Sequence, residues 1–298
     1  MSHTEFRDPR FADIDVWPTS RAISVMLDGQ IEALQSIRAA SEAIASAAEA
    51  SATRLSSGGR LIYAGAGTSG RVAVQDGVEL GPTFGWPAQR LDYLLAGGMA
   101  ALSHSAEGAE DDVLAGRAAA VEAVIGPDDV VIGVAASGRT PFTLAVLETA
   151  RMAGALTIAV ANNAGTPMLG AAEHALLAAT GSEIIAGSTR MKAGTAQKVI
   201  LNMLSTSIML RLGRVYKGLM VDMQVSNEKL LGRAATMVAS LADCSIEKAS
   251  GALLQTSNNI KAAVLVANGL SPDAARASLA EHQGLLRPAI LSLGQDAS

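Results

Sequence analysis

Glycine and hydroxyl side chains gather in the stretch RLIYAGAGTSGR, at residues 60–71, where they could bind a phosphate group. The glycines let the backbone turn tightly and approach a ligand, and the hydroxyl groups can donate hydrogen bonds to it. These residues are Gly65, Gly67, Gly70, Thr68 and Ser69. A helix that begins near Ser69 would point its free N–H groups and its positive dipole end at the same place, which favours an anion.

The glycine spacing also fits Gly-x-Gly-x-x-Gly, which is typical of dinucleotide-binding folds. Those folds need an acidic residue about 20 residues further on, at the end of the next strand, to bind the ribose. Asp92 lies near the start of the next predicted strand, and no other acid fits well. A dinucleotide oxidoreductase is therefore the least favoured alternative. A strand-to-helix turn that has only a structural role and binds no ligand is the other alternative for this stretch.

Two further loops that follow predicted strands carry the same kinds of side chain. They contain Ser137, Gly138, Arg139 and Thr140, and Ser188, Thr189 and Lys192. Because parallel strands end at one edge of a sheet, where such folds bind ligands, we expect the three loops to form one polar pocket for a phosphate and a sugar. Helix capping is the alternative for Thr140 and Ser188. A solvated charge is the alternative for Arg139 and Lys192.

Two glutamates follow the first and second predicted strands. We expect Glu79, between Val78 and Leu80, to be buried, and burial raises the pKa of a carboxyl group. Glu110 lies on a helix predicted from Leu102 to Asp112, whose acids would otherwise form a solvated face. Both carboxyl groups could face the pocket and transfer protons there.

The elements that position these residues alternate between strands and helices. Strands are predicted at residues 61–63, 91–95, 130–135, 156–160 and 174–179. Helices are predicted within residues 20–57 and at 69–78, 102–112 and 141–154, and a long helix follows the third loop and ends at about residue 212. Pro82 is expected to close the helix that begins at residue 69. This alternation predicts a flavodoxin-like α/β/α domain, with a parallel sheet and helices on both faces.

The two ends of the chain differ from this pattern. Residues 1 to about 18 predict an extended arm of the kind that reaches a partner subunit, and short helices with no strand signal follow Cys244. We therefore divide the chain into an arm with helices (1–57), a phosphosugar-binding sheet domain (58–235) and a small C-terminal helical domain (236–298). The arm and the apolar helix 199–210 offer enough hydrophobic surface to predict a homodimer.

Composition excludes several classes of function. The 298 residues carry 23 basic and 28 acidic side chains, a net charge of −5, and only 3% are aromatic, so we expect no nucleic-acid partner and no anionic membrane partner. Cys244 is the only cysteine and we find no signal peptide, which predicts a cytoplasmic protein without an intramolecular disulfide. The four scattered histidines predict no metal site.

Together, these motifs closely resemble those of the bacterial N-acetylmuramic acid 6-phosphate etherases. The similar segments, spread over about residues 5–295, are GAGTSGR, PTFG, EGAED, AASGRTP, GSTRMKAGTAQK, NMLST, MVD and NEKL. The segment from Gly187 to Lys198 is highly specific. The resemblance implies a sugar isomerase (SIS) domain with a small C-terminal helical domain, and a relationship to the glucokinase regulatory protein.

The resemblance also implies an activity. Members of that family are lyases that remove D-lactate from N-acetylmuramic acid 6-phosphate and yield N-acetylglucosamine 6-phosphate in cell-wall recycling. By position, Glu110 is then the base that removes the C2 proton and Glu79 the acid that protonates the leaving lactate. No metal or organic cofactor is implied, because the C1 aldehyde of the open-chain sugar is the electron sink.

Two observations leave alternatives open. Asp76-Gly77-Val78 before Glu79 and Leu80-Gly81 after it depart from the usual form of the family, which bears on the tuning for substrate. A sugar-phosphate isomerase is the nearest enzymatic alternative, since it also begins at C2. A non-catalytic phosphosugar-binding regulator is the alternative from another class, although the first 57 residues contain no basic recognition helix.

Overall fold

The computed structural model describes residues 3–104 and 106–294, which form two compact units. The first unit contains residues 1–78 and 88–208, and the second contains residues 79–87 and 209–298. The divisions therefore fall elsewhere than the predicted boundaries after residues 57 and 235. The N-terminal helices belong with the sheet, because residues such as Ile44 and Leu55 are buried in the first unit.

A five-stranded parallel sheet in the order β2-β1-β3-β4-β5 is the centre of the first unit. The strands are β1 (Leu61–Gly65), β2 (Leu91–Leu95), β3 (Val130–Val134), β4 (Leu156–Ala161) and β5 (His174–Leu177). Every residue of β1, β3 and β4 is buried, which explains why their sequences are almost entirely apolar, with Thr157 in β4 as an exception. The predicted flavodoxin-like α/β/α fold is confirmed.

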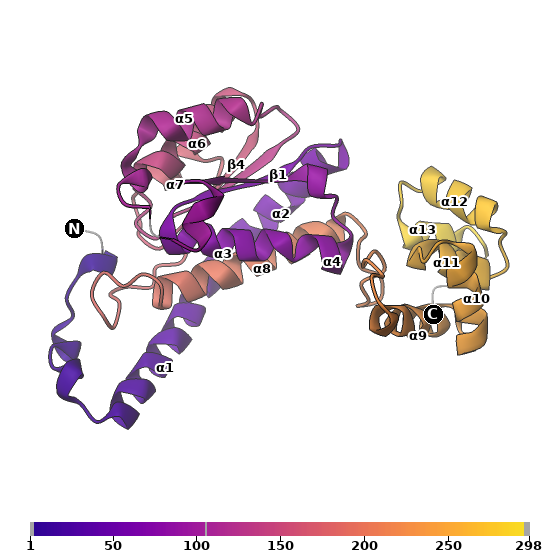
Figure 1. Ribbon diagram of the computed structural model, residues 1–298, viewed down its shortest axis with the longest axis horizontal. Coiled ribbons are helices and arrows are strands. Elements are labelled where there is room, and N and C mark those ends of the chain that lie inside the picture. The colour runs from indigo at the N-terminus through magenta and orange to yellow at the C-terminus, as the bar shows by residue number, and fades with distance from the viewer. Residues whose placement is uncertain (1–2, 105, 295–298) are drawn as a thin grey trace. The chain divides into compact units, whose positions relative to one another are not determined.

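Helices cover both faces of this sheet (Figure 1). One face carries α5 (Val113–Glu122), α6 (Pro141–Met152) and α7 (Pro167–Ala171), and the other carries α2 (Ser41–Ser56), α3 (Gly67–Val78) and α8 (Lys192–Arg211). On the first face, Ile62 and Val131 of the sheet pack against Val146 and Leu147 of α6. Before α2 comes α1 (Thr19–Ser36), which begins one residue before the range 20–57 predicted to contain helices.

The helix predicted from Leu102 to Asp112 is wrong. This segment contains 3-10 turns at Met99–Leu102 and Ala109–Asp111. Gly108, at φ +71°, has the left-handed conformation that interrupts a helix. Asp112 instead caps α5, because its carboxylate accepts a hydrogen bond from the Ala115 N–H at 2.8 Å.

Pro82 does not close the helix after the glycine-rich loop, as the sequence predicted. It lies inside a short helix, α4 (Leu80–Phe84), which follows α3 after one residue. Proline is tolerated there because the first N–H groups of a helix have no partner within it. Gly85, at φ +61°, ends α4, and a side chain on it would collide with the Asp222 carbonyl oxygen.

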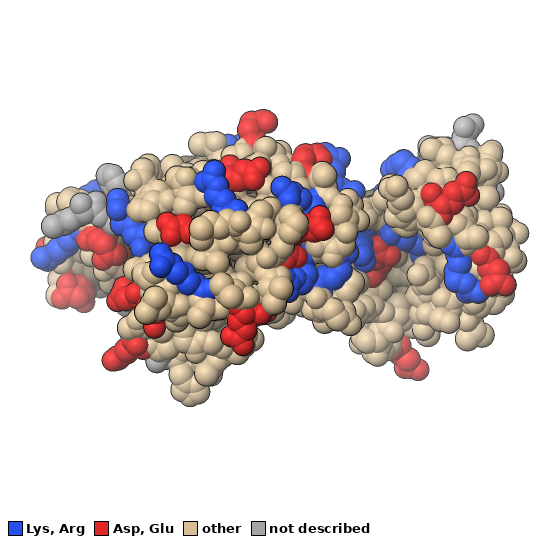
Figure 2. All heavy atoms as spheres, turned by 90° about the horizontal axis from the view of Figure 1, so that it is seen from above, with Lys and Arg blue, Asp and Glu red and all other residues tan. Residues whose placement is uncertain are grey.

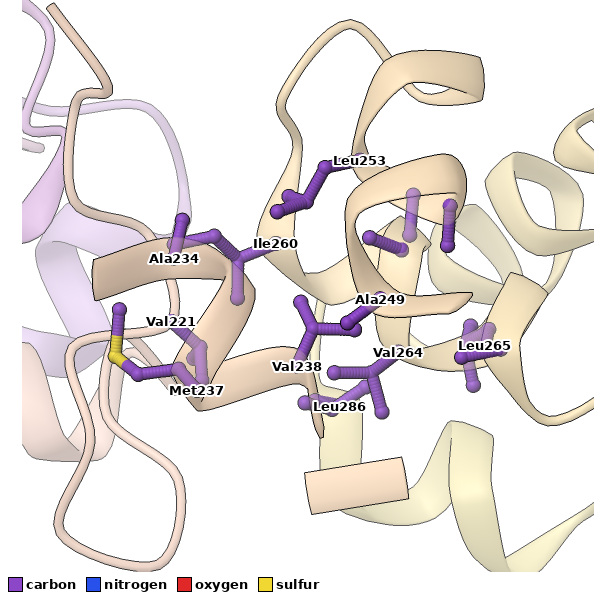
Figure 3. Close-up of a cluster of buried hydrophobic side chains, with 14 of the residues drawn as sticks. Val221, Ala234, Met237, Val238, Ala249, Leu253, Ile260, Val264, Leu265 and Leu286 are labelled. Carbon is purple, nitrogen blue, oxygen red and sulfur yellow. The ribbon is translucent and has the colours of Figure 1, made fainter. Parts of the chain in front are cut away.

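The second unit is a bundle of short helices. They are α9 (Glu228–Ala242), α10 (Ile246–Gln255), α11 (Ile260–Ala267), α12 (Pro272–Glu281) and α13 (Leu286–Leu291). Figure 3 shows their apolar core, in which Val238 of α9 lies among Ala249, Val264 and Leu286. The predicted short helices after Cys244 are confirmed.

Charged groups join the segment 79–87 to this bundle. The Arg214 guanidinium donates to the carbonyl oxygens of Phe84 and Gly85, both at 3.1 Å, and lies 3.7 Å from the Asp222 carboxylate. Asp222 also pairs with Lys261, and burial raises the pKa of Asp222 and lowers that of Lys261. A segment distant in sequence therefore belongs to the second unit.

Acidic and basic side chains are interspersed on the face shown in Figure 2. In the described part of the chain, no helix is both long and apolar enough to cross a bilayer.

A buried carboxylate holds α3 against α8. Asp76 accepts hydrogen bonds from the Tyr63 hydroxyl at 2.7 Å, the Asn202 amide at 2.6 Å and the Ser205 hydroxyl at 3.1 Å. Burial raises the pKa of Asp76, while the three donors oppose that rise. The network fixes the end of α3 that is remote from the glycine-rich loop.

We predict that Asp76→Ala destabilises the first unit by about 3 kcal/mol, because buried donors that lose their acceptor cost about 1–3 kcal/mol each. Urea unfolding measures the change. Glu122→Ala, which removes an exposed carboxylate from α5, is the control and should change the stability by less than about 0.5 kcal/mol. Equal stability of the two variants would contradict a structural role for Asp76.

Candidate active site

A cavity of about 480 Å³ lies where the chain leaves β1 and β3, at the carboxyl edge of the sheet. It brings together residues from all three predicted loops and one predicted glutamate. The predicted residues that line it are Gly67, Thr68, Ser69, Ser137, Arg139, Thr140, Thr189 and Glu110. The loops therefore converge on one polar cavity, as ligand sites of parallel sheets do.

The loop after β1 lines this cavity with the first residues of helix α3. Helix α3 begins at Gly67, two residues before the predicted start. At this end of the helix, the Gly70 N–H donates to the carbonyl oxygen four residues earlier, that of Ala66, at 3.0 Å. The N–H groups of residues 67–69 precede that bond and have no partner within the helix. Together with the Ser69 hydroxyl, they could bind an anion.

The loop after β3 is shaped by Gly138, a predicted ligand residue that does not line the cavity itself. It has φ +63°, and a side chain there would collide with Thr166. This turn lets the Ser137 hydroxyl accept a hydrogen bond from the Arg139 N–H at 3.2 Å. Thr140 precedes α6 but makes no capping hydrogen bond with its side chain, so its hydroxyl can serve a ligand.

The third loop contributes less than the sequence predicted. Thr189 lines the cavity, but Ser188 and Lys192 do not. Lys192 is 4% exposed, and its ammonium group pairs with the Glu32 carboxylate of α1 at 3.1 Å. It therefore joins α8 to α1.

The N-terminus of α8 already has an anion. The buried Glu183 carboxylate accepts hydrogen bonds from the N–H groups of Lys192 and Ala193, both at 2.9 Å. Burial raises the pKa of Glu183, and the two hydrogen bonds oppose the rise. Because this helix terminus is occupied, the anion site of the cavity depends on α3.

The two predicted catalytic glutamates differ in position. Glu110 lies on the 3-10 turn before α5 and is exposed, with its side chain on the cavity wall. It also lines an adjoining cavity of about 550 Å³, together with Arg71, His104 and Glu107. It can therefore contact a molecule that extends from one cavity into the other.

Glu79 directly precedes α4 in the second compact unit. The expected burial of Glu79 is wrong, because the chain leaves α3 with both Val78 and Glu79 exposed. Its side chain lines neither of the two cavities.

Two acidic residues of the cavity were not predicted. Asp111 lies beside Glu110, where we expected a solvated face, and Glu5 comes from the N-terminal arm. The arm packs on its own chain here, because the Gly187 N–H donates to the Thr4 carbonyl at 3.1 Å. Nothing in the local sequence of the arm indicates this contact.

The dinucleotide alternative finds no support at the sheet edge. The Asp92 carboxylate lies at the second residue of β2 and accepts a hydrogen bond from the next N–H, that of Tyr93, at 2.8 Å. The strand ends in Leu94-Leu95, followed by Ala96-Gly97, so no acid stands where a ribose would bind. Across residues 3–104 and 106–294, no group of three histidine, cysteine or acidic side chains could hold a metal ion.

Comparisons with known proteins give the family. Residues 42–151 match the N-terminal SIS domain of glucokinase regulatory protein, residues 104–207 match the SIS domain, and residues 217–282 match the C-terminal lid domain of glucokinase regulatory protein. An N-acetylmuramic acid 6-phosphate etherase of Deinococcus radiodurans is 45% identical over 263 residues, which cover 88% of this chain and 86% of that protein. The chain belongs to the N-acetylmuramic acid 6-phosphate etherase family.

A second etherase, from Mesorhizobium japonicum, is 44% identical over 96% of this chain and 94% of its own length. Among solved structures, a Bacteroides fragilis protein assigned as a phosphosugar isomerase involved in capsule formation superposes with a TM-score of 0.51. It is 18% identical and covers 67% of this chain and 95% of its own, so the likeness concerns the fold alone. The predicted family and its SIS domain are thus confirmed.

Proposed function

We propose that this chain is a carbon–oxygen lyase that cleaves the D-lactyl ether of N-acetylmuramic acid 6-phosphate and releases D-lactate and N-acetylglucosamine 6-phosphate, in cell-wall recycling. Membership of the etherase family is the observation that carries the proposal. The cavity supports it, because hydroxyl groups, free N–H groups and a carboxylate stand together at the edge of the sheet.

The phosphate group binds to the loops after β1 and β3. The N–H groups at the start of α3 and the hydroxyl groups of Ser69 and Ser137 are its leading ligands. Arg139, exposed at the rim, adds a positive charge. Gly138 sets the turn that presents Ser137.

We predict that Ser69→Ala and Ser137→Ala each raise KM about tenfold or more, because a hydrogen bond to a charged group contributes about 1.5–3 kcal/mol. Steady-state kinetics measure the change. Ser188→Ala compares the two assignments: the sequence predicts the same rise in KM, whereas the position of Ser188 off the cavity wall predicts little change. Unchanged KM values in the first two variants would move the phosphate site elsewhere.

The reaction begins with the open-chain sugar. The Glu110 carboxylate removes the C2 proton, which is acidic because the C1 aldehyde stabilises the resulting carbanion as an enolate. The enolate expels the lactyl oxygen from C3 as the carboxyl group of Glu79 protonates it, which leaves an unsaturated aldehyde and D-lactate. Water then adds its hydroxyl group at C3, and a proton returns to C2.

We predict that the chain releases D-lactate from this substrate and that two variants separate the steps. Glu79→Gln should lose lactate release but still exchange the C2 hydrogen for deuterium in heavy water, because enolate formation precedes C–O cleavage. Glu110→Gln should lose both, by at least the ~10²–10⁴-fold typical of a general acid or base. Mass spectrometry and a lactate assay measure the two steps.

The outcomes distinguish the alternatives. If Glu110→Gln exchanges the C2 hydrogen at the normal rate, the roles of the two glutamates are reversed or shared. Lactate release that survives in Glu79→Gln would assign the proton to an acid of the cavity, such as Asp111. An isomerised sugar phosphate without lactate would favour a sugar-phosphate isomerase, and tight binding without any reaction would favour a regulator.

We further infer that the chain acts in the cytoplasm as a homodimer. The helix predicted to offer an apolar surface, residues 199–210, is instead largely buried in its own chain, with Leu201 and Leu204 fully inside. An apolar stripe on α1 supports the inference in its place. It consists of Ile23, Leu27, Ile31 and Leu34, which are 56%, 59%, 45% and 43% exposed. Its spacing places these side chains along one helix face.

We predict a dimer in light scattering at micromolar concentration and a monomer for Leu27→Glu, because a charge in the stripe is costly to bury. Leu254→Glu is the matched control: Leu254 is 83% exposed in the second unit, and its replacement should leave the dimer intact. A monomeric wild-type chain, or dimers of both variants, would reject the stripe as the dimer contact.

A further inference from the structure

Glu5, like Asp111, is an acidic residue of the cavity wall that neither the predicted loops nor the catalytic glutamates account for. We propose that Glu5 binds the substrate by accepting hydrogen bonds from uncharged donors of the sugar, its hydroxyl groups or its acetamido N–H. The inference rests on the proposed function and adds a determinant of specificity from the N-terminal arm.

The arm is fixed to the sheet unit immediately before Glu5. Thr4 is fully buried, and its carbonyl oxygen accepts a hydrogen bond from the Gly187 N–H at 3.1 Å. The Asn163 side chain donates to the Thr4 hydroxyl at 3.2 Å and to the Ala136 carbonyl, in the loop after β3, at 2.8 Å. Thr4 thereby connects two of the loops that form the cavity.

The arm is also fixed beyond Glu5. The Asp8 carboxylate accepts a hydrogen bond from the Ser182 hydroxyl at 3.1 Å, just before the third loop. Its pairing with Arg10 lowers the pKa of Asp8 to about 2, so the carboxylate stays charged at neutral pH. Contacts on both sides therefore hold Glu5 at the cavity.

The Glu5 carboxylate has a prepared place there. Gly187 has φ +75°, and a side chain on it would stand 2.9 Å from the Glu5 carboxylate, so glycine leaves room for this group. Within residues 3–104 and 106–294, no side chain or N–H group donates a hydrogen bond to Glu5 or pairs with it. The acceptor capacity of this exposed carboxylate is thus available to a ligand.

Charge determines which part of the ligand Glu5 contacts. An ionised carboxylate only accepts hydrogen bonds, so it repels a phosphate group and attracts O–H and N–H donors. The proposed place of the anion is the N-terminus of α3 and the Ser137 hydroxyl. Glu5, from the arm, lines the cavity together with Gly187 and Thr189 of the third loop. A phosphosugar can satisfy both with its anionic end on α3 and its neutral donors toward Glu5.

The test compares Glu5→Ala and Glu5→Gln with the wild-type chain and with Glu42→Ala, which removes an exposed carboxylate from α2. Glu5→Ala should raise KM for N-acetylmuramic acid 6-phosphate about tenfold while kcat changes less than about threefold. Inorganic phosphate, as a competitive inhibitor, should bind Glu5→Ala more tightly, because a negative charge has left the cavity. Glu5→Gln keeps one acceptor oxygen, so its KM for the sugar should lie between, but it also lacks the charge, so its phosphate binding should tighten as in Glu5→Ala. Glu42→Ala should match the wild-type chain.

The opposite signs for sugar and phosphate separate binding from scaffolding. If Glu5 only held the arm in place, both ligands would bind more weakly, and that result, or no change in either, overturns the proposal. Calorimetry with N-acetylglucosamine 6-phosphate and with phosphate gives the same comparison without turnover. A wild-type chain that binds both ligands but releases no lactate would reject the proposed function and still test Glu5.

Discussion

The contact of α3 with β1 is the constraint on which the cavity depends. A side chain on Gly65 would lie 3.0 Å from the backbone of Gly70, and one on Gly70 would lie 3.1 Å from Leu95. Glycine at both positions therefore lets the helix begin directly against the end of the strand. This closeness places the free N–H groups of α3 at the carboxyl edge of the sheet, next to the loop after β3. A longer connection would separate these donors.

The second loop, after β3, also depends on a glycine that allows close packing. Gly138 packs against Thr166, and the Met168 N–H donates to the Gly138 carbonyl at 3.2 Å, so α7 supports the turn from behind. The third loop is held differently, by the buried carboxylate of Glu183 on the first N–H groups of α8 and by Thr4 on Gly187. Two loops thus follow strands directly, whereas the third needs distant side chains to fix it.

This difference explains how much could be predicted from the sequence. The strands were predictable because β1, β3 and β4 are buried at every residue and are therefore almost entirely apolar, and the first two loops follow β1 and β3 directly. The surroundings of Lys192 were not, because its partner Glu32 lies 160 positions away along the chain. Glu5 reaches the cavity through Thr4, a contact with no local signal. The exposure of Glu79 was not predicted either, because Pro82 indicated the end of a helix, whereas the short helix α4 follows Glu79 and contains this proline.

The distribution of charge in the cavity suits proton transfer at carbon. A lysine in the cavity would bind a phosphate strongly, but it would also stabilise the charged form of a neighbouring carboxylate and weaken it as a base. Here the buried Lys192 is paired with Glu32, and Arg139 stands exposed at the rim. In the proposed anion site the nearest donors are hydroxyl and N–H groups, which are neutral, and Arg139 adds its charge from the rim. Among the described residues that line the cavity there is no lysine, so in the proposed reaction no ammonium group would weaken Glu110 as a base while the phosphate group is held beside it.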